Sequence, residues 1–168
     1  MPLYLADTSA WLRSGQVFQR WSELVSRAEI ATCDPVSLEL LYSARGAADL
    51  RALRDHLRGL PQLPLDESCS TVAGDTQETL AGRGQHRGPT PVDLLTAAVA
   101  EVHGATLLHY DRQFELIARA TGQDAEWVAP PGSLGSRTAF PPKNMPARGG
   151  GGRNAASENA VLESLPPP

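Results

Sequence analysis

The 168-residue sequence contains little lysine and little cysteine. Its only lysine is Lys143, which disfavours a receiver-type phosphoacceptor, because that class of protein needs a lysine near its acidic residues. The two cysteines, Cys33 and Cys69, have neither the spacing of a metal motif nor that of a disulfide framework. This usage indicates a reducing compartment, and we expect a cytoplasmic protein.

Long apolar runs are also missing. No stretch approaches the ~20 apolar residues of a membrane-spanning helix. Residues 1–3 provide no basic leader and the first apolar run ends at Asp7, so we expect neither a secretory signal nor membrane attachment. With 41% hydrophobic residues, the chain is long enough for one domain with a substantial core.

The net charge of −4 is unevenly distributed. Residues 1–131 carry 11 arginines and 17 acids, a net charge of −6, and four of these acids are candidates for a cation site. Without those four acids, the net charge of this part would be −2. The acidic average is therefore weak evidence against a phosphodiester substrate.

The composition changes near residue 132. Residues 132–168 contain six prolines and six glycines. This segment has too few apolar side chains to offset the entropy cost of ordering the chain. We expect a folded domain over 1–131 and a disordered tail over 132–168. Within the tail, 155–165 is below the ~12–15 residues that an isolated helix needs, although it could fold on a partner.

Strand-like and helix-like segments alternate in the first 131 residues. Buried strands are predicted at 3–6, 29–32, 106–110 and 126–128. Helices are predicted from residue 8 and over 16–27, from 34, over 47–60, 67–81, 90–103 and 112–121. This alternation predicts an α/β fold with three α/β/α layers and a central parallel sheet.

Four acids occupy positions that favour a shared site. Asp7 and Asp111 follow predicted strands, and Asp93 lies at the start of a predicted helix. Each has an ordinary alternative: Asp7 and Asp111 as helix N-caps, and Asp93 in a capping box with Thr90. Glu39 lies in the apolar helix PVSLELLYSA, so we expect it to need a partner instead of facing solvent.

The four positions meet at one edge of the predicted sheet, because parallel strands end where the following helices begin. Two carboxylates 4 Å apart repel by ~4 kcal/mol at an effective dielectric constant of 20, so such a cluster needs protons or cations. Oxygen ligands without histidine or cysteine favour Mg²⁺ or Mn²⁺. We expect Asp7 and Asp93 to hold the ion and Glu39 and Asp111 to complete the catalytic group.

The same residues resemble the PIN domain, and most of all the VapC toxins of bacterial type II toxin–antitoxin pairs. The resemblance rests on DTSAW (7–11), on Glu39 in SLELLYSA, and on residues 83–100 and 107–118. It implies a small α/β/α ribonuclease that depends on Mg²⁺ or Mn²⁺. It also implies an RNA substrate, a VapB-like antitoxin and a homodimer. The family's conserved acids match Asp7, Glu39, Asp93 and Asp111.

Several further residues are candidates for RNA binding or support of the site. The hydroxyl residue that the family places after its first acid matches Thr8 or Ser9. Three basic residues could hold RNA phosphates or simply be solvated loop residues: Arg83, His86 and Arg87. Arg112 could contact RNA or pair with the neighbouring Asp111.

Other functions remain open at this stage. A haloacid-dehalogenase-like phosphatase is disfavoured, because it needs an aspartate two residues after its nucleophile and Asp7 is followed by Thr8 and Ser9. A housekeeping RNA-processing nuclease would use the same four acids as a toxin. A catalytically weak RNA-binding module would be expected to have lost some of them.

Overall fold

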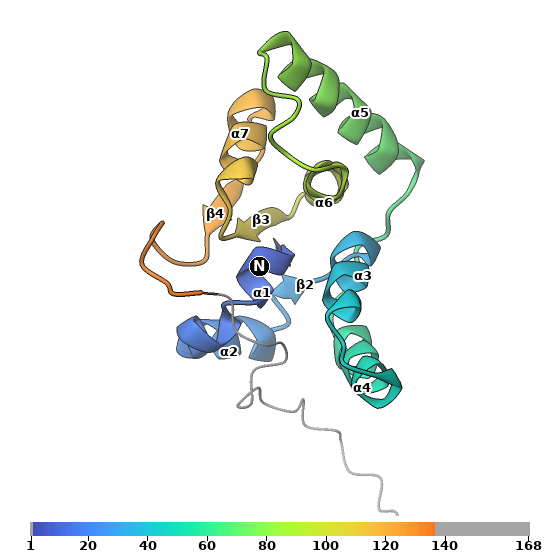
Figure 1. The fold of residues 1–168 in the computed structure, drawn as a ribbon, viewed down its shortest axis with the longest axis vertical. Helices are drawn as coiled ribbons and strands as arrows, with labels where there is room; N and C mark the ends of the chain where they lie inside the picture. Colours follow the sequence, from blue (N-terminus) through green and yellow to red (C-terminus); the bar gives the residue numbers. More distant parts are fainter. Residues whose placement is uncertain (1, 137–168) are drawn as a thin grey trace, which may run out of the picture.

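Four parallel strands form one sheet at the centre of residues 2–136, the part that the computed structural model describes (Figure 1). The strand order is β2-β1-β3-β4. The strands are β1 (Tyr4–Ala6), β2 (Ile30–Ala31), β3 (Thr106–His109) and β4 (Ala125–Trp127). Leu5 of β1 pairs with Ala31 on one side and Leu107 on the other, and all three are fully buried. A sheet covered on both faces accounts for such apolar strands.

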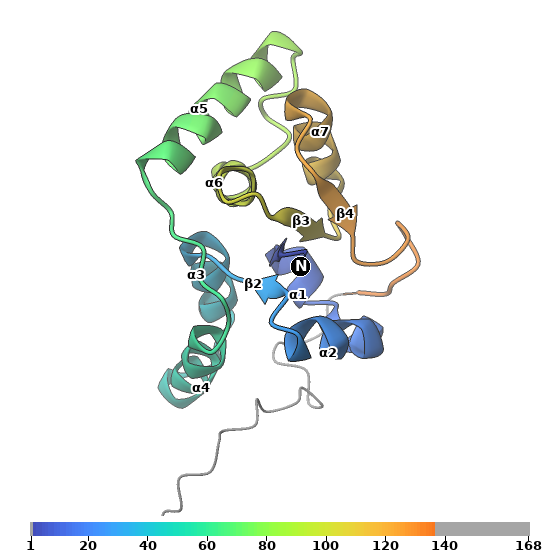
Figure 2. The same ribbon diagram turned by 180° about the vertical axis from the view of Figure 1, so that it is seen from behind.

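Helices surround this sheet (Figures 1 and 2). They are α1 (Thr8–Trp11), the 3₁₀ helix η1 (Ser14–Val17), α2 (Phe18–Ser26), α3 (Asp34–Tyr42), α4 (Ala47–Arg58), α5 (Glu67–Gly82), α6 (Pro91–Val102) and α7 (Arg112–Thr121). Helices α5, α6 and α7 lie on one face, α1 and α2 on the other, and α3 and α4 beside β2. The predicted three-layer fold with a central parallel sheet is confirmed.

The ends of the helices follow from local sequence. Asp66 caps α5 by accepting a hydrogen bond from the Cys69 backbone N–H at 3.1 Å. Pro91 occupies the first turn of α6, where its missing N–H costs nothing. Gly122 ends α7 in the left-handed conformation, with a φ of 81° that favours glycine.

Trp11 of α1 and Trp21 of α2 belong to the core. Trp11 and Trp21 are buried and pack edge to face, with ring centroids 4.6 Å apart. Leu53 and Leu57 of α4 are buried as well. These buried side chains therefore offer no exposed face to a partner. No helix within residues 2–136 is long and apolar enough to cross a membrane.

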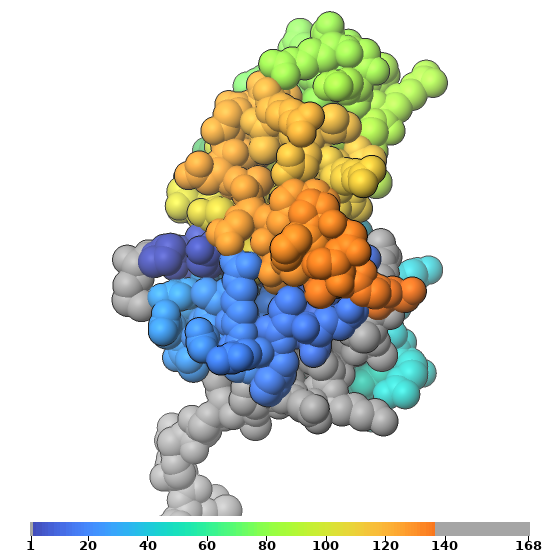
Figure 3. All heavy atoms as spheres, turned by 90° about the vertical axis from the view of Figure 1, so that its left-hand side faces the viewer, coloured from blue at the N-terminus to red at the C-terminus, as the bar shows by residue number. Residues whose placement is uncertain are grey.

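The chain after β4 returns to the N-terminal helices (Figure 3). The Leu134 backbone N–H donates to the Tyr110 hydroxyl at 2.8 Å, and the Gly135 N–H donates to Gln16 Oε1 at 2.8 Å. These contacts lie just past the expected domain boundary at residue 131, which stays a prediction. Residues 137–168 of the expected tail lie outside the described part of the chain.

Candidate metal-binding and active site

The strand order reverses between β1 and β3. From β1 the chain first continues to β2 on one side, and later returns to β3 on the other side. Open parallel sheets place their ligands at the carboxyl ends of the strands that flank such a reversal. Asp7 directly follows β1, and its backbone N–H donates to the Leu108 carbonyl of β3 at 2.9 Å. Asp7 therefore lies at the position where this topology favours a ligand.

Asp7 combines a capping role with an unfavourable charge environment. Its side chain is only 5% exposed and accepts a hydrogen bond from the Ser9 backbone N–H at 2.8 Å, as an N-cap does. Burial nevertheless raises the pKa of Asp7 to about 6, and repulsion from Asp93 and Glu39 adds to the rise. The hydrogen bond from Ser9 offsets only part of that increase.

Ser9 connects the ends of β1 and β3. Its Oγ accepts a hydrogen bond from the Tyr110 backbone N–H at 2.8 Å. Beyond Tyr110, the Asp111 N–H donates to Nδ1 of the fully buried His109 at 3.3 Å, and Asp111 caps α7 by accepting from the Gln113 N–H at 3.0 Å. The backbone from the end of β3 to Asp111 is thus held by hydrogen bonds to Ser9 and His109. His109 itself is a core residue.

Glu39 reaches the site from α3, although its surroundings differ from the expectation. The Thr8 hydroxyl donates to Glu39 Oε2 at 2.7 Å, which supplies the predicted partner. The expectation that Glu39 does not face solvent was wrong: Glu39 is exposed, and Leu38 and Tyr42 are 67% and 93% exposed. The apolar pattern of α3 misleads because no element covers this face of the helix among residues 2–136.

Asp93 forms the capping box that was the ordinary alternative. The Thr90 backbone N–H donates to Asp93 Oδ2 at 2.6 Å, and the Asp93 N–H donates to Thr90 Oγ1 at 3.2 Å. Burial still raises the pKa of Asp93, with repulsion from Asp111 and Glu39 contributing. Capping and membership of an acidic cluster therefore occur together in the same side chain.

The donor set of these acids fits a hard divalent cation. Asp7 is repelled by Asp93 and Glu39, and Asp93 by Asp111 and Glu39, which places Asp93 within electrostatic reach of the other three acids. Such repulsion is relieved by protonation or by a cation, and carboxylate oxygens suit Mg²⁺ or Mn²⁺. Within residues 2–136, the one trio whose ligand atoms all lie within 4.8 Å of one another is a different group, Asp66, Cys69 and His103.

The four basic candidates do not form one group. The Arg83 guanidinium donates to the carbonyl of Arg119 at 3.0 Å, near the C-terminus of α7, so it has a structural role. His86 and Arg87 are exposed in the loop before α6. Arg112 is exposed, and no ion pair within residues 2–136 joins it to Asp111.

Arg13 is a residue near the site that the sequence reasoning missed. Its guanidinium donates to the Ser9 carbonyl at 3.1 Å and lies over the Tyr110 ring, 4.4 Å from the centroid. It thereby packs against both residues that connect the two strand ends. Only the position of Arg13 one turn after Ser9 could have indicated this contact.

Comparison with known proteins identifies the family. Residues 4–120 match the family described as the PIN domain. The chain is 40% identical over 136 residues to Ribonuclease VapC18 of Mycobacterium tuberculosis, covering 79% of this chain and 99% of that protein. The chain belongs to the VapC group of the PIN domain family. It is also 39% identical over 133 residues to Ribonuclease VapC21 of the same species, covering 77% of this chain and 96% of VapC21.

Solved structures agree on the fold of this VapC-family chain. The DNA-bound VapBC structure from Salmonella typhimurium superposes with a TM-score of 0.63 at 20% identity, covering 76% of this chain and 98% of the other. VapBC2 of Rickettsia felis, bound to a promoter DNA fragment, superposes with a TM-score of 0.62 at 20% identity, covering 76% and 99%. At this identity the likeness establishes the α/β/α architecture alone.

Proposed function

We propose that this VapC-family protein is an endoribonuclease dependent on Mg²⁺ or Mn²⁺, and the toxin of a toxin–antitoxin pair. The observation that carries the proposal is the raised pKa of Asp7, at the strand reversal, and of Asp93: burial raises both values, and repulsion from neighbouring acids adds to the rise. The relatives named VapC ribonucleases support RNA as the substrate class. The four catalytic residues of the proposal are Asp7, Glu39, Asp93 and Asp111.

Asp7 and Asp93 would hold the cation, because these two acids are the most disfavoured as unpaired anions. When bound, the ion supplies Lewis-acid polarisation of a phosphate oxygen and lowers the pKa of a water molecule. Glu39, held by the Thr8 hydroxyl, and Asp111, held by its cap on α7, would complete the site and orient the attacking water. Ser9 is a positioning residue, since it joins the two strand ends.

The substrate is single-stranded or loop RNA in this proposal. The deep, narrow major groove of double-stranded RNA hides its base edges, whereas splayed bases in a loop are accessible. His86 and Arg87 are exposed near the start of α6 and can contact the phosphates beside the acids. Arg112, which follows Asp111, is a second candidate for such contacts.

A VapB-like antitoxin is the proposed protein partner. A groove of about 410 Å³ runs between α3 and α4, lined by Leu38, Leu41 and Leu57 with Arg54 and Arg58 among its charged residues. Leu38 adjoins Glu39 in sequence, so a segment seated in this groove would also restrict the acidic cleft. The VapBC assemblies among the structural neighbours support this type of partner.

The proposal also includes a homodimer, a cytoplasmic location and a dispensable segment after residue 131. Light scattering on the purified protein tests the dimer directly. A chain ending at residue 131 should keep metal-dependent cleavage and inhibition by the antitoxin. Loss of inhibition with retained cleavage would instead assign residues 132–168 to the partner.

The decisive experiment is cleavage of labelled loop-containing RNA by tag-free protein. We expect cleavage with Mg²⁺ or Mn²⁺, none with EDTA, and none by Asp7→Asn purified in parallel. Equal cleavage by wild type and Asp7→Asn would indicate a contaminating nuclease and overturn the assignment. Growth arrest on expression, reversed by the small protein encoded directly upstream, would distinguish a toxin from a housekeeping nuclease.

A further inference from the structure

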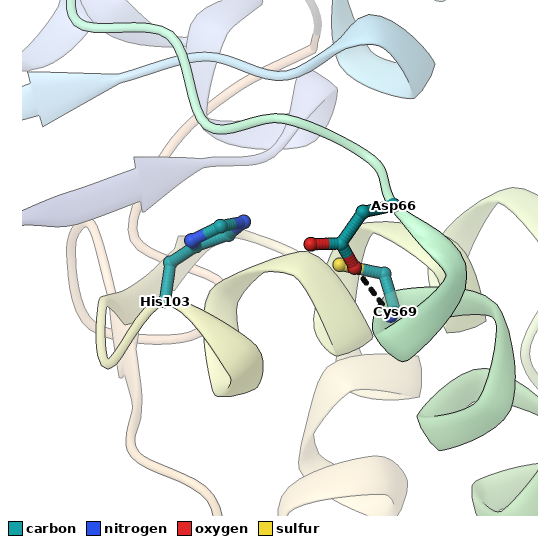
Figure 4. A group of neighbouring side chains, drawn as sticks. All are labelled: Asp66, Cys69 and His103. Atoms are coloured by element: carbon teal, nitrogen blue, oxygen red, sulfur yellow. Dashed lines mark hydrogen bonds between the residues drawn. The ribbon is translucent and has the colours of Figure 1, made fainter.

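A second group of potential metal ligands lies away from the four acids. Asp66, Cys69 and His103 each offer one ligand atom, and these three atoms all lie within 4.8 Å of one another. Asp66 and Cys69 come from the start of α5, and His103 from the end of α6, so the three side chains face one another across two helices (Figure 4). The spacing of the cysteines could not reveal this group, because Cys33 is not part of it.

Local contacts hold the three side chains in these positions. Asp66 caps α5 through the Cys69 N–H, so the carboxylate is fixed over the first turn. The Pro64 carbonyl contacts both other residues: His103 Nε2 lies 2.9 Å from it, and Cys69 Sγ 3.7 Å. Cys69 is fully buried, and its thiol interacts with the Pro64 carbonyl and with the Asp66 side chain. The sulfur is thus held beside a second potential ligand and away from water.

The group is separate from the proposed nuclease site. Asp93 lies in the first turn of α6 and His103 directly follows its last turn. At 1.5 Å per residue, their separation of ten positions in sequence places the two residues about 15 Å apart along the helix. The two groups therefore lie toward opposite ends of α6, and one ion cannot serve both.

We propose that Asp66, Cys69 and His103 bind Zn²⁺ and thereby clamp the start of α5 to the end of α6. One sulfur, one nitrogen and one oxygen form the mixed donor set that Zn²⁺ accepts and that Mg²⁺ disfavours. Three protein ligands leave the fourth tetrahedral position to a water molecule. Binding needs the thiolate, so the Cys69 S–H bond breaks, the Zn–S bond forms, and the proton passes to the buffer.

The test is a titration of tag-free, full-length protein with Zn²⁺ alone, performed in the Asp7→Asn background to weaken the acidic site. We expect one equivalent of Zn²⁺ per chain, a higher melting temperature and release of a proton on binding. Co²⁺ in place of Zn²⁺ should give the near-ultraviolet charge-transfer band of a cobalt–thiolate bond.

Matched variants assign the ligands. Cys69→Ser and His103→Gln should each weaken Zn²⁺ binding by at least ~100-fold, because loss of an outer-shell partner alone costs ~10–100-fold. Cys33→Ser changes the other buried cysteine and should bind as tightly as its parent. Asp66→Asn keeps an N-cap residue while weakening the ligand, so a loss of affinity there is not a folding defect.

Two results would overturn the clamp. One is absence of Zn²⁺ binding in Asp7→Asn protein whose circular dichroism shows that it is folded. The other is a cobalt band that persists in Cys69→Ser or disappears in Cys33→Ser. Because both readouts are independent of RNA cleavage, failure of the clamp leaves the nuclease proposal untouched, and the reverse also holds.

Discussion

Asp7 and Asp66 both cap a helix, but the pKa of Asp7 is raised and the pKa of Asp66 is lowered. Each caps a helix by accepting a backbone N–H, Asp7 from Ser9 and Asp66 from Cys69. At the exposed Asp66 this hydrogen bond holds the pKa of the carboxyl below its usual value. At Asp7, burial and the neighbouring acids raise the pKa to about 6 despite the cap.

The difference separates an acid whose ionised form is already stabilised in the folded protein from one whose ionised form is disfavoured there. A cap stabilises the ionised form, so it should lower the pKa of a capping acid when nothing opposes it. A raised pKa in a capping acid means that burial and like charges outweigh the hydrogen bond. A bound divalent cation would offset this unfavourable balance at Asp7 by stabilising the ionised carboxylate.

The largest expected effect is on RNA cleavage. Asp7→Asn should lower the rate by about 1,000-fold or more, since removing even an outer-shell partner of a metal typically costs ~10–100-fold. Asp49→Asn is the matched control, because Asp49 is a partly exposed acid in the first turn of α4 whose pKa is lowered by a hydrogen bond from the Arg45 backbone N–H. Single-turnover assays should show Asp49→Asn within about threefold of wild type. A comparable loss in both variants would contradict the comparison.

The next effect is on stability without metal. The pKa of Asp7 rises from 3.8 to about 6 on folding, so the folded state binds more protons between these values. The free energy of unfolding should therefore fall as the pH rises from about 4 to about 6, by roughly 3 kcal/mol. Asp7→Asn should remove this pH dependence of the free energy of unfolding and should be more stable than wild type at pH 7.5.

Denaturant melts in EDTA at pH 4 and pH 7.5 measure this difference. The advantage of Asp7→Asn should be largest at pH 7.5 and vanish at pH 4, where the wild-type carboxyl is protonated. Asp66→Asn should show no such gain, because the pKa of Asp66 is lowered. A loss of stability in Asp7→Asn at pH 7.5 would show that capping is the dominant role of Asp7.

A smaller effect is expected where Thr8 supports Glu39. Thr8→Val keeps the side-chain shape and removes the hydroxyl that donates to Glu39 Oε2. Cleavage should fall about tenfold, in the range of outer-shell losses, while Thr8→Ser retains most of the rate. Equal rates for Thr8→Val and wild type would remove Thr8 from the site.

The smallest effect concerns the capping box. Thr90→Ala loses the side chain that accepts from the Asp93 N–H and should lower the free energy of unfolding by about 1 kcal/mol. Cleavage at 25 °C should stay within about threefold of wild type. A severe loss of cleavage with intact folding would mean that the cap itself positions Asp93 for the reaction.

The architecture could be predicted from the sequence because buried strands and capped helices have recognisable local sequence patterns. Asp7, Asp93 and Asp111 could be placed at one sheet edge because each directly follows a strand or opens a helix. The exposure of Glu39 could not be predicted, since helical periodicity does not show which apolar face the rest of the fold leaves uncovered. Thus Leu38 and Tyr42 of α3 remain in solvent.

The other features that the sequence did not predict depend on contacts between segments far apart in the chain. Arg83 reaches the end of α7 across 36 positions of sequence, and no local pattern marks that pairing. His103 meets the start of α5 only because α5 and α6 pack together. The capping alternatives for Asp7 and Asp93 also proved compatible with an acidic cluster, so local roles alone could not decide between them.

Calorimetric titration with Mn²⁺ at pH 7.5 tests the central claim most directly. Wild type and Cys69→Ser should bind Mn²⁺ with similar affinity, whereas Asp7→Asn and Asp93→Asn should bind at least ~100-fold more weakly. That result would place the hard cation at the strand reversal and not at the end of α6. Absence of Mn²⁺ binding by folded wild type, or unchanged binding by Asp7→Asn, would contradict the account.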